Sequence, residues 1–160
     1  MGLLLSTLLA AAPASGLEPF FFFVGDWTCS GDVAAEWSWS VSKPDEVGQI
    51  IGSGETATAE GSLKVFRDTF SYGKEEKKKL MHVVVFHAAS GVEALSTDGW
   101  AGDKLVFAGD LRQANSRVRV RETFKRWGDE AFTQIHEQEL LDGSWKVTGT
   151  ANCRRVSAGH

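Results

Sequence analysis

Glu122 is the residue whose surroundings most favour chemistry, because it is a carboxylate on an otherwise apolar strand face. In the segment 117–127, apolar and charged residues alternate, and Glu122 falls in the apolar set with Phe124. Burial on such a face raises the pKa of a carboxyl group and lets it act as a general acid or base. The interpretation we favour is a core carboxylate hydrogen-bonded to Gln134 or His136 across a hairpin, because buried polar groups are normally paired.

Three of the four histidines lie in segments with strand patterns and are candidate ligands for a metal or a haem iron. His82 shares a face with Val84 and His87 belongs to the opposite face, so one of the two points inward whichever face is buried. His136 is expected to join Glu122 as an inward polar residue. A lone histidine on an apolar strand is more commonly a hydrogen-bonded core residue than a ligand. The sequence therefore predicts no bound metal, with His82, His87 or His136 as haem ligand in the alternative.

Motifs of the common enzyme classes are absent from the sequence. It contains no G-x-S-x-G, H-E-x-x-H, P-loop or Rossmann glycine fingerprint. Cys29 and Cys153 are too far apart in the sequence to form a local metal knuckle. We therefore expect a non-catalytic protein without a cofactor. The alternative is an enzyme that uses Glu122 and His136.

The first residues have the features of a cleavable leader. Residues 1–14 contain no charged side chain, and their short apolar run ends in small residues around Pro13. We expect 1–14 to be a signal peptide and 15–160 to form one domain, exported to the periplasm or the extracellular space. In an oxidising compartment we expect the two cysteines, Cys29 and Cys153, to form a disulfide; the alternative is two unpaired buried thiols.

Composition argues against two classes of partner. The net charge of −4 argues against binding to nucleic acid or to an anionic membrane surface. No apolar run after residue 14 is long enough to cross a bilayer, so we do not expect an integral membrane protein. A hydrophobic content of 42% is enough for a core. These values are typical of a globular domain.

Strand patterns recur along the rest of the chain. Apolar residues alternate with polar ones in Val33–Val41, Lys104–Leu111 and Arg117–Trp127, and turn residues follow about every ten residues. No segment predicts a helix longer than a turn or two. Phe20–Val24 is favoured as part of the core, and it also fits a helical turn that plugs a barrel or the start of a strand. This series of hairpins predicts an all-β fold, an antiparallel up-and-down barrel of about eight to ten strands.

The interior of such a barrel holds side chains and at most one small ligand. Inward faces supply the candidate lining of a cavity: Trp37, Trp39, Phe107, Glu122, Phe124, Phe132, Gln134 and His136. The last strand is expected to place Trp145 and Val147 on the same face as Cys153. Because an apolar cavity with a few polar groups is the usual small-molecule site, the expected partner is a small apolar or amphipathic molecule. The alternative is a structural envelope protein whose aromatic side chains fill the core.

Gly25-Asp26-Trp27, near the start of the first expected strand, resembles the G-x-W signature of lipocalins and the wider calycin group. In that fold the tryptophan closes one end of the barrel beneath a basic residue from the last strand. The resemblance implies that Gly25 and Trp27 close the barrel together with Arg154, or alternatively Arg155, as a cation over the aromatic ring. We also expect the first and last strands to lie side by side.

Five motifs, taken in order, resemble an uncharacterised group of bacterial exported, lipocalin-like proteins. They are Val24-Gly25-Asp26-Trp27-Thr28-Cys29, Gly102-Asp103-Lys104-Leu105-Val106-Phe107-Ala108-Gly109, Arg121-Glu122-Thr123-Phe124, Asp142-Gly143-Ser144-Trp145-Lys146-Val147 and Cys153-Arg154. That group has no settled activity, so the resemblance implies the barrel and export rather than a substrate. Small calycin-like barrels related to nitrobindin hold haem through a single histidine, which is the basis of the haem alternative.

Overall fold

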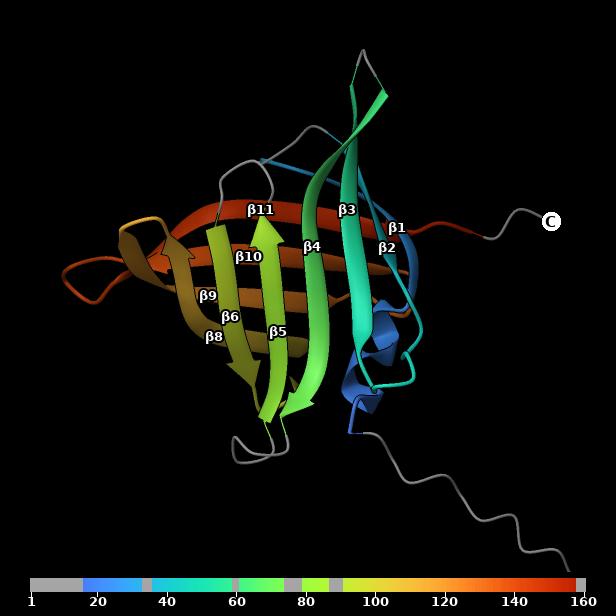
Figure 1. Ribbon diagram of the computed structural model, residues 1–160, viewed down its shortest axis with the longest axis horizontal. Helices are drawn as coiled ribbons and strands as arrows, with labels where there is room; N and C mark the ends of the chain where they lie inside the picture. Colours follow the sequence, from blue (N-terminus) through green and yellow to red (C-terminus); the bar gives the residue numbers. More distant parts are fainter. Residues whose placement is uncertain (1–15, 33–35, 59–60, 74–78, 87–90, 158–160) are drawn as a thin grey trace, which may run out of the picture.

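The computed structural model describes residues 16–32, 36–58, 61–73, 79–86 and 91–157, which fold into a closed antiparallel β-barrel (Figure 1). Its strands are β1 (Gly25–Gly31), β2 (Trp37–Val41), β3 (Ile50–Thr58), β4 (Gly61–Gly73), β5 (Lys79–Phe86), β6 (Gly91–Thr97), β7 (Trp100–Ala101), β8 (Lys104–Gln113), β9 (Ser116–Arg126), β10 (Ala131–Glu139) and β11 (Trp145–Arg155). Within these residues, ten strands form the wall; β6 pairs directly with β8, and β7 is a short addition beside β8. The predicted up-and-down barrel is therefore confirmed.

The first and last strands close the barrel, as expected. β1 pairs antiparallel with β11, and Cys29 lies opposite Cys153 in this pairing. The two cysteines form the predicted disulfide, which joins residues 124 positions apart in the sequence. In the chain-entropy description, closing a loop of this length stabilises the folded state by about 5 kcal/mol. The disulfide therefore holds the two ends of the domain together at their shared seam.

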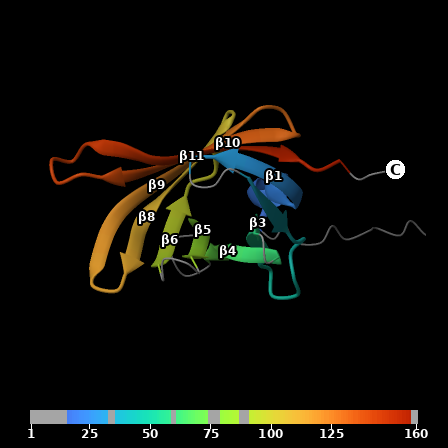
Figure 2. The ribbon, with the colours of Figure 1, turned by 90° about the horizontal axis from the view of Figure 1, so that it is seen from above.

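A short 3-10 helix, η1 (Glu18–Phe23), plugs one end of the barrel, and Figure 2 shows it enclosed beside β1 and β3. Pro19 lies in its first turn, where a missing N–H costs no hydrogen bond. Phe20 and Phe23 are fully buried, and their ring centroids lie 4.9 Å and 5.4 Å from that of Phe70. The phenylalanine run therefore forms the predicted helical plug, and its buried rings are part of the core, as favoured.

Aromatic side chains from the wall fill the same end of the barrel. The core around η1 includes Trp27, Trp39, Phe70, Leu105, Phe107, Phe124 and Phe132. The indole Nε1 of Trp27 donates to the carbonyl oxygen of Phe23 at 2.8 Å, so its polar atom is satisfied in the core. The Phe107 ring lies 5.8 Å from Phe20, and the Phe132 ring lies 5.7 Å from Phe23. The interior at the η1 end is therefore solid.

Arg155 caps the tryptophan at this end. Its guanidinium carbon lies 4.2 Å from the ring centroid of Trp27, and its two terminal nitrogens donate to the carbonyl oxygens of Val24 and Phe22 at 2.7 Å and 2.8 Å. Of the two predicted candidates, Arg155 takes this position and Arg154 does not. Alternation along β11 turns Arg154 to solvent and returns Arg155 toward Trp27.

Gly25 gives the G-x-W spacing a physical reason. Its φ is +126°, and a Cβ at this position would lie 2.6 Å from Nη1 of Arg155. A larger residue would both strain the backbone and displace the guanidinium from Trp27. Glycine is therefore required here because it leaves room for the arginine that covers the tryptophan.

A β-bulge redirects the beginning of β11. The pairing of β10 with β11 shifts register after His136, which makes Thr148 the extra residue of the bulge. After the bulge, β11 faces the interior as predicted. Before it the prediction is wrong: Val147 is exposed, and the Trp145 ring lies 4.5 Å from the guanidinium of Arg121 on the outer face. The bulge also turns the Thr148 hydroxyl toward His136.

The predicted signal peptide, residues 1–14, lies outside the described residues. Leu17, at the start of the described part, is fully buried in the core beside η1. None of the helices in the described part of the chain has the length and apolarity needed to cross a bilayer.

Candidate functional site

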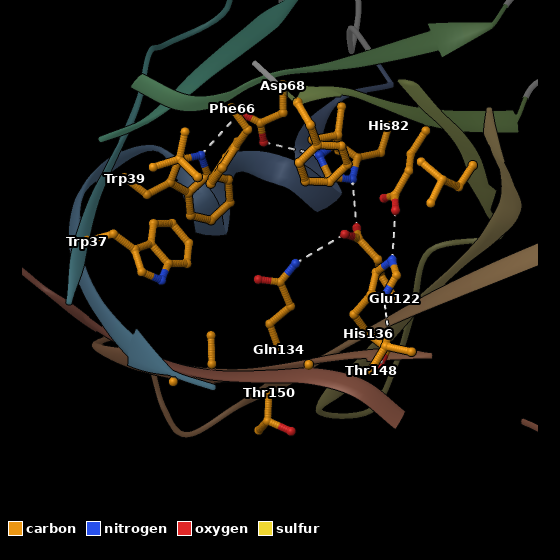
Figure 3. Close-up of a pocket in the computed structure, with 18 of the residues that line it drawn as sticks. Trp37, Trp39, Phe66, Asp68, His82, Glu122, Gln134, His136, Thr148 and Thr150 are labelled. Atoms are coloured by element: carbon orange, nitrogen blue, oxygen red, sulfur yellow. Dashed lines mark hydrogen bonds and ion pairs between the residues drawn. The ribbon is translucent and has the colours of Figure 1, made fainter. Parts of the chain in front are cut away.

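The end of the barrel away from η1 holds a cavity of about 280 Å³. Its apolar lining includes Trp37, Trp39, Phe66, Val84, Phe86 and Leu111. Its polar lining includes Asp68, His82, Glu93, Glu122, Gln134 and His136. Figure 3 shows the rings of Trp37, Trp39 and Phe66 on one side and Glu122 and His136 on the opposite side. One side of the cavity is therefore apolar, and the opposite side is polar.

Three rings form the apolar side near the open end. Trp37 meets Phe66 edge to face with ring centroids 5.2 Å apart, and Phe86 lies 6.5 Å from Phe66. These rings come from β2, β4 and β5, and each belongs to the inward face of its strand. Offset and edge-to-face pairs of this kind present a rigid apolar surface to the cavity.

His82 on β5 lies between two carboxylates on the polar side. Its Nε2 is 3.1 Å from Oδ2 of Asp68, and its Nδ1 is 3.1 Å from Oε2 of Glu122. Burial alone would lower the pKa of His82, but the hydrogen bonds and charges of Asp68 and Glu122 raise it to about 9. Both ring nitrogens therefore donate, and His82 is an imidazolium ion at neutral pH. Its ring stacks on Phe70 with centroids 4.2 Å apart.

The remaining oxygens of the two carboxylates accept from neutral donors. Nε1 of Trp39 donates to Oδ1 of Asp68 at 3.1 Å, and Nε2 of Gln134 donates to Oε1 of Glu122 at 3.2 Å. Burial would raise the pKa of Glu122, but the hydrogen bond from His82 and its charge lower it. The general acid or base with a raised pKa is therefore not supported at Glu122. The residue is the hydrogen-bonded core carboxylate that the sequence favoured, with Gln134 as a partner.

A second polar cluster joins Glu93 on β6 to His136 on β10. Nε2 of His136 lies 2.7 Å from Oε1 of Glu93, and Nδ1 lies 2.6 Å from Oγ1 of Thr148. Burial raises the pKa of Glu93, and the hydrogen bond with His136 offsets only part of that rise. Burial would lower the pKa of His136, but the hydrogen bond and charge of Glu93 raise it. A proton is therefore held between the two side chains.

The structure separates the predicted lining residues into two groups. Those that line the cavity are Trp37, Trp39, Glu122, Phe124, Gln134 and His136. Phe107 and Phe132 belong instead to the solid core around η1, so that part of the prediction is wrong. Both point inward as predicted, but alternation along a strand does not say at which level of the barrel an inward residue lies.

Sequence reasoning missed Asp68, Glu93 and Thr148. Asp68 lies between Phe66 and Phe70 on β4, and Glu93 shares the buried face of β6 with Gly91 and Leu95. An isolated carboxylate with apolar residues two positions away is the signal that singled out Glu122. It applies to Asp68 and more weakly to Glu93, which has a large apolar residue on one side only. Thr148 carried no such signal, because its orientation depends on the bulge.

In the part of the chain that the structure describes, every histidine ring nitrogen already has a hydrogen-bond partner, which bears on the haem alternative. Both ring nitrogens of His82 face carboxylates, and those of His136 face Glu93 and Thr148. His87 lies outside the described residues. His82 therefore offers no lone pair to a haem iron, and Nε2 of His136 could reach a metal only by giving up the proton that it shares with Glu93.

Comparison with known proteins adds no family to this picture. A scan against protein-family models finds none that matches the chain, and a search of curated proteins finds no matching relative. The cavity and its two polar clusters therefore carry the functional assignment.

Proposed function

We propose that this protein binds a small amphipathic molecule in its barrel cavity, outside the cytoplasm, without transforming it chemically. The observation that carries the proposal is the cavity, which has one apolar side and one polar side. Concave, largely apolar sites with a few polar groups are the usual binding sites of small molecules. Export is supported by the Cys29–Cys153 disulfide, because such bonds persist in oxidising compartments.

The cavity limits the size and chemistry of the ligand. Its volume of about 280 Å³ is near the lower end of the range of small-molecule pockets, roughly 300–1,000 Å³. Trp37 and Phe66 offer an apolar surface to the body of the ligand. The amide oxygen of Gln134 points away from Glu122 into the cavity, where it can accept a hydrogen bond (Figure 3). The ligand is thus a small molecule with an apolar body and a hydrogen-bond-donating head.

Binding without reaction is supported by the pairing of the polar groups. His82 uses both ring nitrogens as donors to carboxylates and has no lone pair for a general base. Each oxygen of Glu122 already accepts a hydrogen bond. The groups best placed for proton transfer are therefore engaged with one another.

The contact of Trp27 with Arg155 over Gly25 supports placing the chain among lipocalin-like barrels. It supplies the closure that the G-x-W resemblance implies. A lipocalin-like barrel is consistent with the binding role, and we propose membership in that group together with that role.

A neutral fluorescent probe, N-phenyl-1-naphthylamine, tests the cavity directly. We expect saturable binding of one probe per chain. Val84→Trp, which places a large ring inside the cavity, should weaken probe binding by about tenfold or more, the equivalent of about 1.4 kcal/mol. Val85→Trp, on the exposed face of the same strand, is the matched control and should change the affinity less than about twofold.

Native mass spectrometry of protein purified from its own host extends this test to the natural ligand. A small molecule that co-purifies and is displaced by the probe supports the proposal. Equal probe affinities in the Val84→Trp and Val85→Trp variants would place binding outside the cavity and refute it.

A further inference from the structure

Glu93, Glu122 and His136 bring three potential metal ligands together on the cavity wall. They come from β6, β9 and β10, and their ligand atoms lie within 4.8 Å of one another. All three residues line the cavity, so an ion can reach them from solvent. Two carboxylates and one imidazole form a donor set that divalent first-row metals accept.

One oxygen of this cluster lacks a partner. Glu93 is only 1% exposed and lines the cavity, yet its Oε2 has no hydrogen-bond partner among the described residues. Buried polar atoms are normally paired, and an unpaired carboxylate oxygen is costly. An ion that enters from the cavity would satisfy this oxygen.

His136 and Glu93 share a proton that a metal ion can replace. Nδ1 of the His136 ring lies 2.6 Å from Oγ1 of Thr148, and Nε2 lies 2.7 Å from Oε1 of Glu93. The second distance is that of a short charge-assisted hydrogen bond, so one proton lies between Nε2 and Oε1. A metal ion that replaces this proton would be bound by both atoms.

We propose that Glu93, Glu122 and His136 bind one divalent transition-metal ion, with Zn²⁺ as the probe, and leave a coordination position open to the cavity. On binding, the ion displaces the proton shared by Glu93 and His136 into solvent. Calcium and magnesium fit this site poorly, because both prefer oxygen ligands and one of the three ligands here is an imidazole nitrogen. The open position takes water or the polar head of a ligand.

Outer contacts already orient two of the three ligands. Glu122 accepts from His82 and Gln134, and the His136 ring donates to Thr148. Metal-binding histidines almost always donate their second ring nitrogen in this way, and metal-binding carboxylates are likewise hydrogen-bonded. Hydrogen bonds from residues outside the ligand set therefore hold Glu122 and His136 in place.

Titration with Zn²⁺ alone tests the proposal on the full, untagged chain after treatment with EDTA. Isothermal titration calorimetry near neutral pH, in two buffers with different ionisation enthalpies, measures stoichiometry and proton release together. We expect one Zn²⁺ per chain and the release of about one proton. Mg²⁺ and Ca²⁺ should show no comparable binding.

A pair of isosteric variants locates the site. Glu93→Gln should weaken Zn²⁺ binding by about 100-fold or more, because it replaces a ligating carboxylate. Glu137→Gln is the matched control, since Glu137 follows His136 on β10 but pairs with Arg121 on the outer face. We expect its Zn²⁺ affinity to stay within about twofold of the unmodified protein.

Equal Zn²⁺ affinities in the two variants, or binding without proton release, would assign the ion to surface groups and overturn the proposal. If Glu93→Gln does not fold, Co²⁺ bound to the unmodified chain decides the question. The expected result is intense tetrahedral ligand-field bands, whereas a weak octahedral spectrum refutes the site. Because no organic ligand is present, a negative result leaves the proposed small-molecule binding standing.

Discussion

In the half of the barrel around η1 the inward side chains are aromatic and fill the interior, whereas in the other half they surround a cavity whose wall contains charged groups. The same strands build both halves. On β4, Phe70 packs against η1, Asp68 contacts His82, and Phe66 faces the cavity. Three successive inward residues of this strand thus lie in the solid core, in a buried ion pair and at the cavity wall.

The two halves differ in what their side chains contribute to stability. Rings in the filled half remove apolar surface from water, at about 25 cal/mol per Å². Asp68, His82 and Glu122 in the hollow half must instead be desolvated, a cost that an apolar core of similar shape would avoid. Proteins retain such groups mainly at functional sites. The η1 half therefore supplies stability, and the other half is where we propose that the ligand binds.

Truncation in the filled half has the largest expected effect. Phe23→Ala removes a fully buried ring that contacts Trp39, Phe70 and Phe124, and should lower the free energy of unfolding by about 4 kcal/mol. Phe21→Ala, on the exposed side of the same helix, should cost less than about 1 kcal/mol. Urea denaturation followed by tryptophan fluorescence measures both changes. Equal losses would contradict the description of η1 as a core plug.

The charged half should lose stability at alkaline pH. The pKa of His82 is about 9 in the folded protein and 6.5 when the side chain is exposed. Because the folded state holds this proton more tightly, the stabilisation is fully present below pH 6.5 and is lost as the pH rises through 9. A shift of this size corresponds to about 3 kcal/mol. Urea denaturation at a series of pH values, with EDTA present, measures the decline.

His82→Gln separates this effect from other alkaline titrations. The variant cannot form the imidazolium between Asp68 and Glu122, so it should be less stable in mild acid and lack this alkaline decline. If both proteins lose the same stability at alkaline pH, other groups cause the loss. In that case the charge of His82 does not stabilise the hollow half.

The smallest expected effect concerns the bulge residue Thr148. Thr148→Val removes the hydroxyl that orients His136 and should lower the free energy of unfolding by about 1 kcal/mol. The same change should weaken Zn²⁺ binding about tenfold. Thr150→Val is the control, because the Thr150 side chain points away from the cavity (Figure 3). If calorimetry gives the same Zn²⁺ affinity for the two variants, the bulge does not position the site.

Part of the candidate site could be predicted because strand alternation is a local property. Glu122, Gln134 and His136 were placed on inward faces from residues two positions away, and they meet across β9 and β10. Their other partners lie far along the chain: His82 is 40 residues from Glu122, and Glu93 is 43 residues from His136. No local pattern specifies which side chains a closed barrel places opposite one another.

The sequence by itself determined the all-β barrel, the disulfide at its seam and the aromatic character of its interior. These features follow from alternation, turn residues and cysteine content, which neighbouring residues or simple counts reveal. Only the tertiary structure decided that Arg155 caps Trp27, which inward rings fill the core, and that Glu93 meets His136. The level of each residue depends on strand register and on the β-bulge in β11, and barrel closure couples these across strands distant in sequence.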